Sequence, residues 1–319
     1  MRVPVRHSLL AAIPAALLCS AAWAEVPAVA ADIAPIHGLV ARVMQGVGTP
    51  DLVIRHGASP HDYSLRPSEA AALEQADLVF WVGAPLTPWL ADTIATLAGD
   101  ARVVALLEAP GTITLTYREG ATFEDHDHAD HADHGGHDDH GHGDHAHDHL
   151  GVDPHAWLDP ENARIWLDVI AAELSSRDPD NAAIYAANAA AGHAEIDAAA
   201  AEVAAAVAPL AEAGFVVFHD AYHYFEARFG LAAAGAITLG DATDPSPARV
   251  AEIRDAIAET GVACVFSEPQ FDPGLVAAVL EGASAKTAVI DPLGAELTPG
   301  PGFYPALLTA LGASMAGCL

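Results

Sequence analysis

A dense run of histidine and aspartate occupies residues 124–150 of this chain. The run holds ten histidines and eight aspartates and almost no apolar side chain. Its histidines are His126, His128, His131, His134, His137, His140, His142, His145, His147 and His149. Imidazoles and carboxylates at this density bind transition metals whatever the backbone conformation, because some subset can always converge on an ion. The same composition cannot bury a core, so we expect a mobile, metal-collecting loop rather than a folded site.

Three histidines and one aspartate outside this run have settings typical of a fixed metal site. His61 lies just beyond an apolar run, and His155 lies in a turn bracketed by two prolines. His219 and Asp291 each follow a further apolar run directly. Three neutral imidazoles and one carboxylate would fill a tetrahedral zinc site. Manganese normally takes more oxygen ligands, so this set disfavours manganese, but it does not separate zinc from copper.

The other four histidines of the folded body have simpler interpretations. We expect His37 and His56 to be structural and His193 to be solvated on a helix. His223 stands one helical turn after His219, where it is a candidate for supporting that residue or for contacting a second ion.

The elements that must position these residues alternate between short apolar runs and helix-like stretches. The apolar runs cover residues 51–54, 78–82, 102–106, 214–218, 236–238, 262–266 and 287–290. The helical patterns cover residues 66–76, 87–98, 221–229, 246–260 and 272–282. This alternation predicts an α/β fold in which parallel sheets are flanked by helices. The four candidate ligands stand at element ends, where parallel sheets place their binding sites.

An alanine-dominated stretch separates the two halves of the chain. Residues 181–210 contain no proline before Pro209 and few charges. Alanine is the best helix former, and thirty such residues would make a rod of roughly 45 Å. We therefore expect two α/β lobes, residues 25–180 and 211–319, joined by one long rigid helix. The alternative, in which this helix packs into one large domain, stays open.

The first 24 residues have the pattern of a secretory signal peptide. Arg2 and Arg6 precede an apolar stretch at 9–18, and a small-x-small cleavage motif ends at Ala24. The apolar stretch is shorter than the ~20 residues of a transmembrane helix. The pattern predicts export to the periplasm and a mature chain that starts near Glu25.

The mature chain is strongly acidic and contains two cysteines. The full chain carries a formal charge of −30, and removal of Arg2 and Arg6 makes it −32. Such a charge disfavours nucleic acid and anionic membranes as partners and favours cations. Cys264 and Cys318 remain after cleavage. An exported pair in an oxidising compartment favours one disulfide over a thiolate metal site.

The ordered motifs resemble those of the periplasmic metal-binding proteins that supply ABC importers, and most closely the zinc-specific ZnuA type. The resemblance covers essentially the whole mature chain and is carried by residues 57–68, 153–160, 218–231 and 291–294. Members of this type also carry a His-rich loop at this point in the chain. The resemblance implies two pseudo-symmetric α/β lobes joined by a long helix, with one metal ion in the cleft between them.

The resemblance also implies roles for individual residues. The implied zinc ligands are His61, His155 and His219. Manganese-type relatives carry a glutamate at the position of His219, and relatives often supply a carboxylate ligand at the position of Asp291. Some zinc members have a glutamate before the first histidine, whereas this chain has Pro60, so the expected fourth ligand is Asp291 or water. The Cys264–Cys318 pair resembles a disulfide of the zinc branch.

We therefore expect an extracytoplasmic zinc-binding protein, not an enzyme, that captures Zn(II) in a cleft and delivers it to an ABC importer permease. We expect a monomer, with a periplasmic zinc metallochaperone as a further candidate partner. One alternative is a secreted zinc buffer or metallochaperone that acts mainly through the His-rich loop. A zinc hydrolase is a weaker alternative, because the sequence has no His-Glu-x-x-His or Gly-x-Ser-x-Gly motif. Glu268 is more simply interpreted as a hydrogen-bonding group than as a general base.

Overall fold

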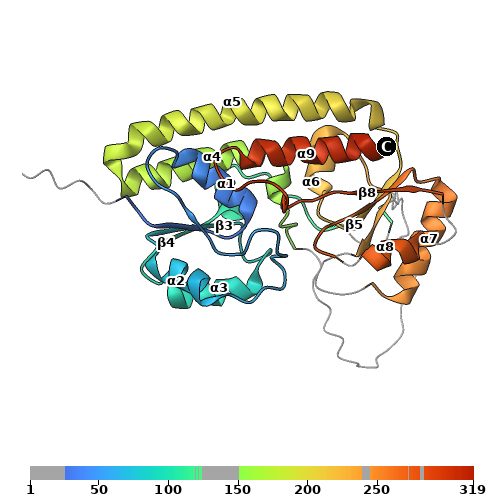
Figure 1. Ribbon diagram of the computed structural model, residues 1–319, viewed down its shortest axis with the longest axis horizontal. Helices are drawn as coiled ribbons and strands as arrows, with labels where there is room; N and C mark the ends of the chain where they lie inside the picture. Colours follow the sequence, from blue (N-terminus) through green and yellow to red (C-terminus); the bar gives the residue numbers. More distant parts are fainter. Residues whose placement is uncertain are drawn as a thin grey trace, which may run out of the picture.

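Two four-stranded parallel sheets form the framework of the protein (Figure 1). The computed structural model describes residues 26–118, 120, 122–123, 151–238, 245–271, 273–280 and 284–319. The predicted signal peptide, 1–24, and the His/Asp-rich segment, 124–150, lie outside these residues. The first sheet has the order β2-β1-β3-β4 and the second the order β6-β5-β7-β8. The two halves therefore repeat one topology, as the alternation of the sequence predicts.

The strands are short and mostly buried. Their bounds are Val29–Ala31 (β1), Asp51–Leu52 (β2), Leu78–Trp81 (β3), Arg102–Ala105 (β4), Phe215–His219 (β5), Gly235–Thr238 (β6), Cys264–Ser267 (β7) and Lys286–Val289 (β8). Seven of them fall on the apolar runs of the sequence. The exception, β1, is a central strand of the first sheet and was not predicted, because three residues are too few to show a pattern.

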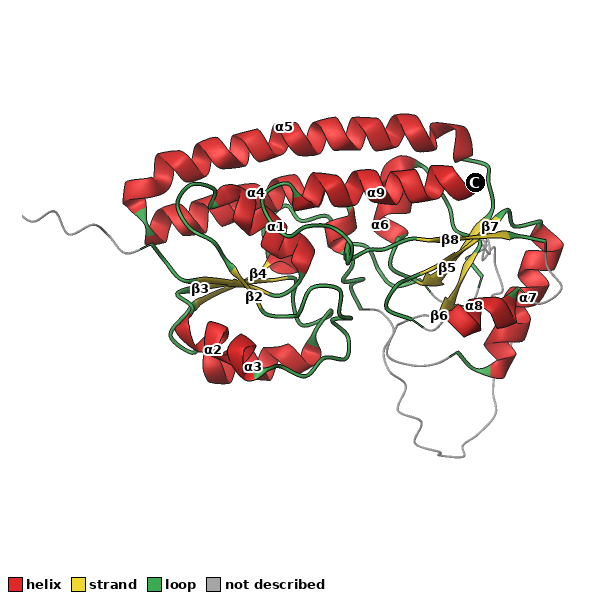
Figure 2. Cartoon of the chain, in the orientation of Figure 1, coloured by secondary structure: helices red, strands yellow, loops and turns green. Residues whose placement is uncertain are grey.

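Helices cover both faces of each sheet (Figure 2). Their bounds are Ala34–Val43 (α1), Pro67–Gln75 (α2), Pro88–Leu97 (α3), Pro160–Arg177 (α4), Ala182–Val207 (α5), His223–Phe229 (α6), Pro247–Thr260 (α7), Pro273–Val279 (α8) and Phe303–Cys318 (α9). Five of these helices begin at a proline. Proline suits the first helical position, where its missing N–H costs no hydrogen bond and its fixed φ already matches the helix.

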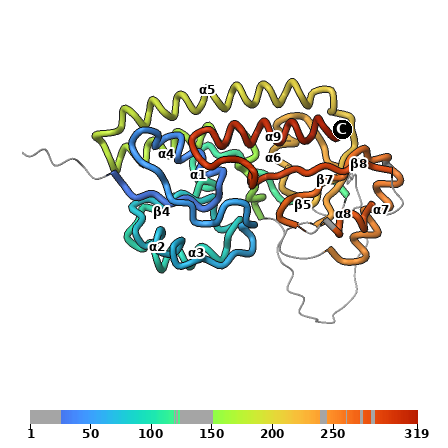
Figure 3. The backbone as a smooth tube through the Cα atoms, viewed as in Figure 1, coloured from blue at the N-terminus to red at the C-terminus, as the bar shows by residue number. Residues whose placement is uncertain are grey.

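The predicted long helix is present as α5 and passes above both lobes (Figure 3). At 1.5 Å per residue its 26 residues span about 39 Å. Its buried positions recur every three to four residues and are Tyr185, Ala189, Gly192, Ile196, Ala199, Val203 and Val207. The fold prediction of two parallel-sheet lobes joined by a long helix is thus confirmed.

The last helix, α9, also ties the two lobes together. It packs along α5, touches α1 of the first lobe, and contacts β8 of the second. Close approach to α5 depends on Gly312, where an added Cβ would lie 3.0 Å from the Val203 side chain. A disulfide between Cys264 of β7 and Cys318 fixes the end of α9 to the second sheet. Among the described helices, none combines the length and apolarity required to cross a membrane.

Candidate metal centre

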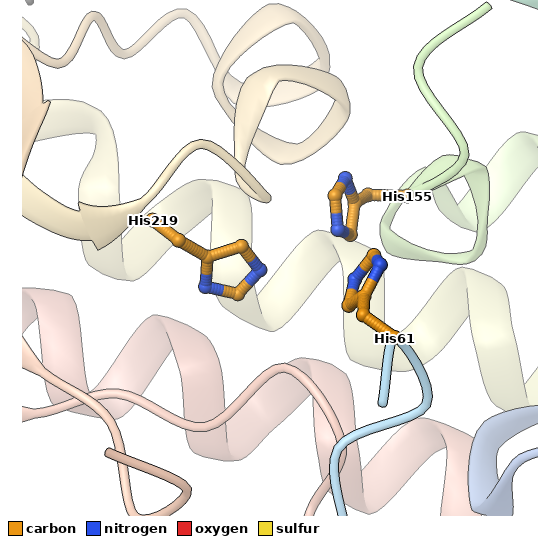
Figure 4. Close-up of side chains that lie close together, drawn as sticks. All are labelled: His61, His155 and His219. Atoms are coloured by element: carbon orange, nitrogen blue, oxygen red, sulfur yellow. The ribbon is translucent and has the colours of Figure 1, made fainter. Parts of the chain in front are cut away.

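Three histidines from separate elements converge between the lobes, and their rings face a common point (Figure 4). His61 lies in the loop between β2 and α2, His155 immediately precedes the short 3-10 turn Ala156–Leu158, and His219 ends β5. One ring nitrogen from each lies within 4.8 Å of the others. The ring centroids are 5.2–6.2 Å apart. These distances bring together the three imidazoles of the predicted site.

A buried carboxylate orients His155. The Nδ1 atom of His155 lies 2.7 Å from Oδ1 of Asp153, and the backbone N–H of His155 donates to the same oxygen at 3.0 Å. Asp153 is itself 1 % exposed. With Nδ1 engaged, the buried Nε2 atom has no hydrogen-bond partner among the described residues. A metal-binding histidine is typically held in this way, with one nitrogen on a carboxylate and the other directed at the ion.

His219 is held by a second carboxylate in the same manner. Its Nδ1 atom lies 2.8 Å from Oε1 of Glu268, which comes from the turn after β7 and is 3 % exposed. Phe271 meets the His219 ring edge-on at 5.6 Å between centroids. Glu268 is thus a hydrogen-bonding partner of His219, as the sequence indicates. The two carboxylates fix which nitrogen of each imidazole faces the centre.

His61 is the most accessible of the three. It is half-buried, whereas His155 and His219 are each 3 % exposed. Its backbone N–H donates to the hydroxyl of Ser59 at 3.3 Å, and the carbonyl of the preceding Pro60 accepts from the indole of Trp89 at 2.9 Å. His61 therefore marks the side of the centre that is nearest to solvent.

Burial keeps the centre in the form that binds metal. Desolvation lowers the pKa of His155 well below its ordinary value, and the neighbouring His219 lowers the pKa further. Only neutral imidazole coordinates a metal, so His155 is ready to bind at neutral pH. Burial also raises the pKa of Asp153 to about 7, against the opposing effect of the hydrogen bond from His155.

Asp291 is not part of the three-histidine group. Its Oδ1 atom accepts hydrogen bonds from the backbone of Leu293 at 3.0 Å and from Nε2 of Gln270 at 3.1 Å. Its Oδ2 atom accepts from the backbone of Ala295. Asp291 thus stands beside the centre, with both oxygens engaged by the loop that follows β8.

Of the remaining histidines, His37 is buried, as a structural residue would be, whereas His193, which was expected to be solvated, has a side chain only 23 % exposed. His37 contacts the carbonyl of Pro50 at 3.1 Å, and His193 lies 3.1 Å from a carboxylate oxygen of Asp168. The Nδ1 atom of His223 lies 3.8 Å from Oδ2 of Asp153, on the oxygen that does not bind His155. The ten loop histidines, from His126 to His149, fall outside the described residues.

A buried ion-pair cluster next to His219 could not be seen in the sequence. Arg118 donates from Nε to Asp220 at 3.0 Å and from Nη1 and Nη2 to Glu226 at 2.8 and 2.9 Å. The side chains of Asp220 and Glu226 are 2 % and 3 % exposed. Phe123 stacks beneath the guanidinium at 3.8 Å. Arg118 precedes Asp220 by 102 residues, so no local motif connects the two.

Arg118 belongs to a segment that crosses from the first lobe to the second. Thr116 forms an antiparallel bridge with Val152, and Thr122 forms another with Gly235 of β6. The crossing segment therefore ends against the edge strand of the second sheet, where the His/Asp-rich run begins. Arg118 fastens this segment to Asp220, the residue that follows His219.

The comparisons with known proteins agree with this geometry. The sequence profile of the family described as "Zinc-uptake complex component A periplasmic", ZnuA, matches residues 29–318. The chain belongs to the ZnuA family. A Brucella abortus relative described as "High-affinity zinc uptake system protein ZnuA" is 45 % identical over 328 residues, with 98 % of each chain covered. A Paracoccus denitrificans relative with the same description is 46 % identical over 304 residues, with 93 % of each chain covered.

Solved structures of ZnuA share the fold. One, described as "Crystal structure of ZnuA", superposes with a TM-score of 0.73 at 21 % identity and covers 92 % of this chain and 99 % of its own. A deletion mutant of ZnuA with zinc bound gives the same TM-score and identity. Members of the ZnuA family are periplasmic components of zinc-uptake systems, so this chain is a zinc-binding transport component and not an enzyme. That excludes the hydrolase alternative.

Proposed function

We propose that this protein captures one Zn(II) ion between its lobes and delivers it to the membrane permease of an ABC importer. His61 and His155 come from the first lobe and His219 from the second, so one bound ion would bridge the two. The observation that carries the proposal is the convergence of three imidazole nitrogens within 4.8 Å of one another. Relatives described as high-affinity zinc uptake proteins support zinc as the cargo.

The donor set supports zinc over manganese. Three imidazoles suit a tetrahedral zinc ion, whereas manganese prefers oxygen-rich coordination. His219 contributes a nitrogen where manganese-type relatives are expected to carry a glutamate. For the fourth ligand the two candidates are Asp291 and water.

We assign the His/Asp-rich segment, residues 124–150, an accessory role in collecting zinc. Its described flanks lie near residues that adjoin the centre: Phe123 packs on Arg118, which binds the Asp220 that follows His219, and Gly151 precedes His155 by four residues. Weak, rapidly exchanging sites at this place would raise the local zinc concentration beside the cleft. The alternative, a zinc buffer that works mainly through this segment, would not require an ordered site of fixed imidazoles.

The cellular setting follows from the same proposal. The signal peptide, residues 1–24, would direct export to the periplasm, and lobes at 25–180 and 211–319 would enclose the ion on either side of the linking helix at 181–210. The loaded protein would dock as a monomer on the permease, and a periplasmic metallochaperone is a further partner that would load it.

Deletion of residues 125–149 separates the two functions. A variant with a Gly/Ser linker of equal length should retain one tight zinc equivalent, because the three histidines of the centre are untouched. It should take zinc from a competing chelator more slowly than the intact protein. Isothermal titration and stopped-flow exchange measure the two quantities. Loss of the tight equivalent would favour the buffer, and an unchanged rate would remove the collecting role.

Zinc affinity should fall as the pH falls, but less steeply than for three ordinary imidazoles. Three groups with a pKa of ~6.5 would weaken binding by roughly 10³-fold between pH 7.5 and 5.5, since protonated imidazole cannot coordinate. Burial holds the pKa of His155 well below its ordinary value, so its protonation contributes less over this range than that of an ordinary imidazole. Competition against a chelator calibrated at each pH, with the loop-deleted protein, measures the slope. A fall of 10³-fold or more would contradict the lowered pKa.

A further inference from the structure

Gln270 is a polar residue of the metal pocket to which the proposed site gives no role. The pocket is a small cavity of about 10 Å³, and Gln270 lines it together with His61, His155 and His219. The other residues around Gln270 in this lining are chiefly apolar and include Phe271, Pro292 and Leu293. A polar side chain among apolar neighbours in a ligand pocket is typically one that fixes how the ligand sits.

The contact with Asp291 determines which way the Gln270 amide faces. The carboxylate of Asp291 is held in place by the backbone N–H groups of Leu293 and Ala295. A carboxylate only accepts hydrogen bonds, so the NH₂ end of the Gln270 amide must face it, and Nε2 lies 3.1 Å from Oδ1. The carbonyl oxygen, Oε1, is therefore turned away from Asp291. Asp291 thus sets the orientation of the amide.

The carbonyl oxygen of Gln270 is buried and has no hydrogen-bond partner among the described residues. A buried acceptor without a partner costs free energy, and a bound water, ion or ligand is one way in which native proteins satisfy such a group. Because Gln270 lines the pocket, that partner is to be sought in the pocket itself. The acceptor calls for a hydrogen-bond donor there, and imidazole nitrogens that coordinate zinc offer none.

A zinc-bound water is a donor of the required kind. Three imidazoles leave one position of a tetrahedral zinc ion for a further ligand. Neither Asp291 nor Glu268 belongs to the group of converging ligand atoms; Glu268 is engaged through Oε1 by His219, and its Oε2 is a second buried acceptor in the pocket lining. Water on zinc presents two O–H groups and has its lone pair directed at the metal, so it matches an acceptor and not a second donor.

We propose that Gln270 is a positioning residue for the captured ion: its carbonyl oxygen accepts a hydrogen bond from the water that completes the zinc coordination. Asp291 then acts through Gln270, by fixing the direction of the amide, rather than as a ligand. This inference rests on the proposed three-histidine site. It predicts that Gln270 contributes to the affinity for zinc.

The test replaces Gln270 with methionine, which has nearly the same size and no amide. Gln75→Met, the same change on an exposed residue at the end of α2, is the matched control. Loss of one hydrogen bond to the water should weaken zinc binding by roughly three- to tenfold in chelator competition. One zinc equivalent should still bind, and the control should match the wild type.

Azide binding to the cobalt-substituted protein gives the second readout. Azide displaces a metal-bound water and alters the visible cobalt spectrum, and the carbonyl oxygen of Gln270 should repel the anion. Gln270→Met should therefore bind azide more tightly while it binds zinc more weakly, and general loosening of the fold would not produce that pair of shifts. Gln270→Asn, which retracts the amide by one methylene, should give the same signs with smaller amplitudes.

The variant Asp291→Asn distinguishes the positioning role from direct coordination. If Asp291 acts through Gln270, the double variant should be little weaker in zinc binding than Gln270→Met alone. The proposal is overturned if azide leaves the wild-type cobalt spectrum unchanged while Asp291→Asn removes tight binding, which would make Asp291 a ligand. It is also overturned if Gln270→Met changes neither zinc nor azide affinity. Failure of the three-histidine site itself would be seen separately, as tight zinc binding that survives the loss of His219.

Discussion

Replacing His219 with alanine should weaken zinc binding by about 10²- to 10³-fold. Zinc sites with four protein ligands bind with roughly 10–16 kcal/mol, or about 2.5–4 kcal/mol for each ligand, and tenfold in affinity corresponds to about 1.4 kcal/mol. The loss should fall mainly on zinc binding, because the substitution keeps the backbone of β5 and removes only the ring that Glu268 holds. Competition titration of the loop-deleted protein avoids zinc bound by the segment 124–150.

The matched control is His193→Ala. His193 is a histidine of α5 that pairs with Asp168 on the surface of the helices, away from the pocket. This variant should bind zinc like the wild type. Equal affinities for the two variants would remove His219 from the centre and, with it, the proposed function.

Replacing His219 with glutamate tests whether this position also determines which metal is preferred. Manganese-type relatives are expected to carry glutamate there, so His219→Glu should keep a bound metal but shift the preference toward manganese. The measurement is the ratio of zinc to manganese affinity. A ratio equal to that of the wild type would show that this position does not set selectivity.

The three histidines could be predicted from the sequence because each stands in a local pattern. His61 follows a strand, His155 lies between prolines that start a turn and a helix, and His219 ends a strand. Parallel sheets place their binding sites at such ends, and the packing of the two lobes then brings His61 and His155 of one lobe to His219 of the other. Asp291 also ends a strand, but the loop that follows it takes both carboxylate oxygens, and a sequence pattern does not show where a side chain turns.

The contacts that join the lobes were beyond prediction for a different reason. The helix α9 lies at the end of the chain yet contacts the first lobe. Arg118 meets carboxylates 102 and 108 residues away. Each of these depends on tertiary packing, which periodicity and local propensity do not encode. The sequence therefore predicts the elements and the three converging histidines better than it predicts the contacts between the lobes.

Replacing Arg118 with methionine should lower the free energy of unfolding by roughly 3–5 kcal/mol. The substitution would leave Asp220 and Glu226 as two buried carboxylates without their cation, and breaking a buried pair by removing one partner costs about this amount. Asp220 follows His219, and Arg118 lies in the segment that crosses between the lobes. The substitution should therefore destabilise both the surroundings of His219 and the attachment of this segment to the second lobe. Urea denaturation of the zinc-free protein measures it.

Arg102→Met is the matched control for this change. Arg102 pairs with Glu173 at 2.8 Å, but its side chain is 63 % exposed, so water screens the pair and its loss should leave the stability nearly unchanged. Arg118→Lys should fall between the two arginine-to-methionine variants. A lysine keeps the charge, but its single ammonium group cannot reproduce the planar fork with which Arg118 binds both carboxylates. If Arg118→Met were as stable as Arg102→Met, the buried cluster would not be what holds the crossing segment beside His219.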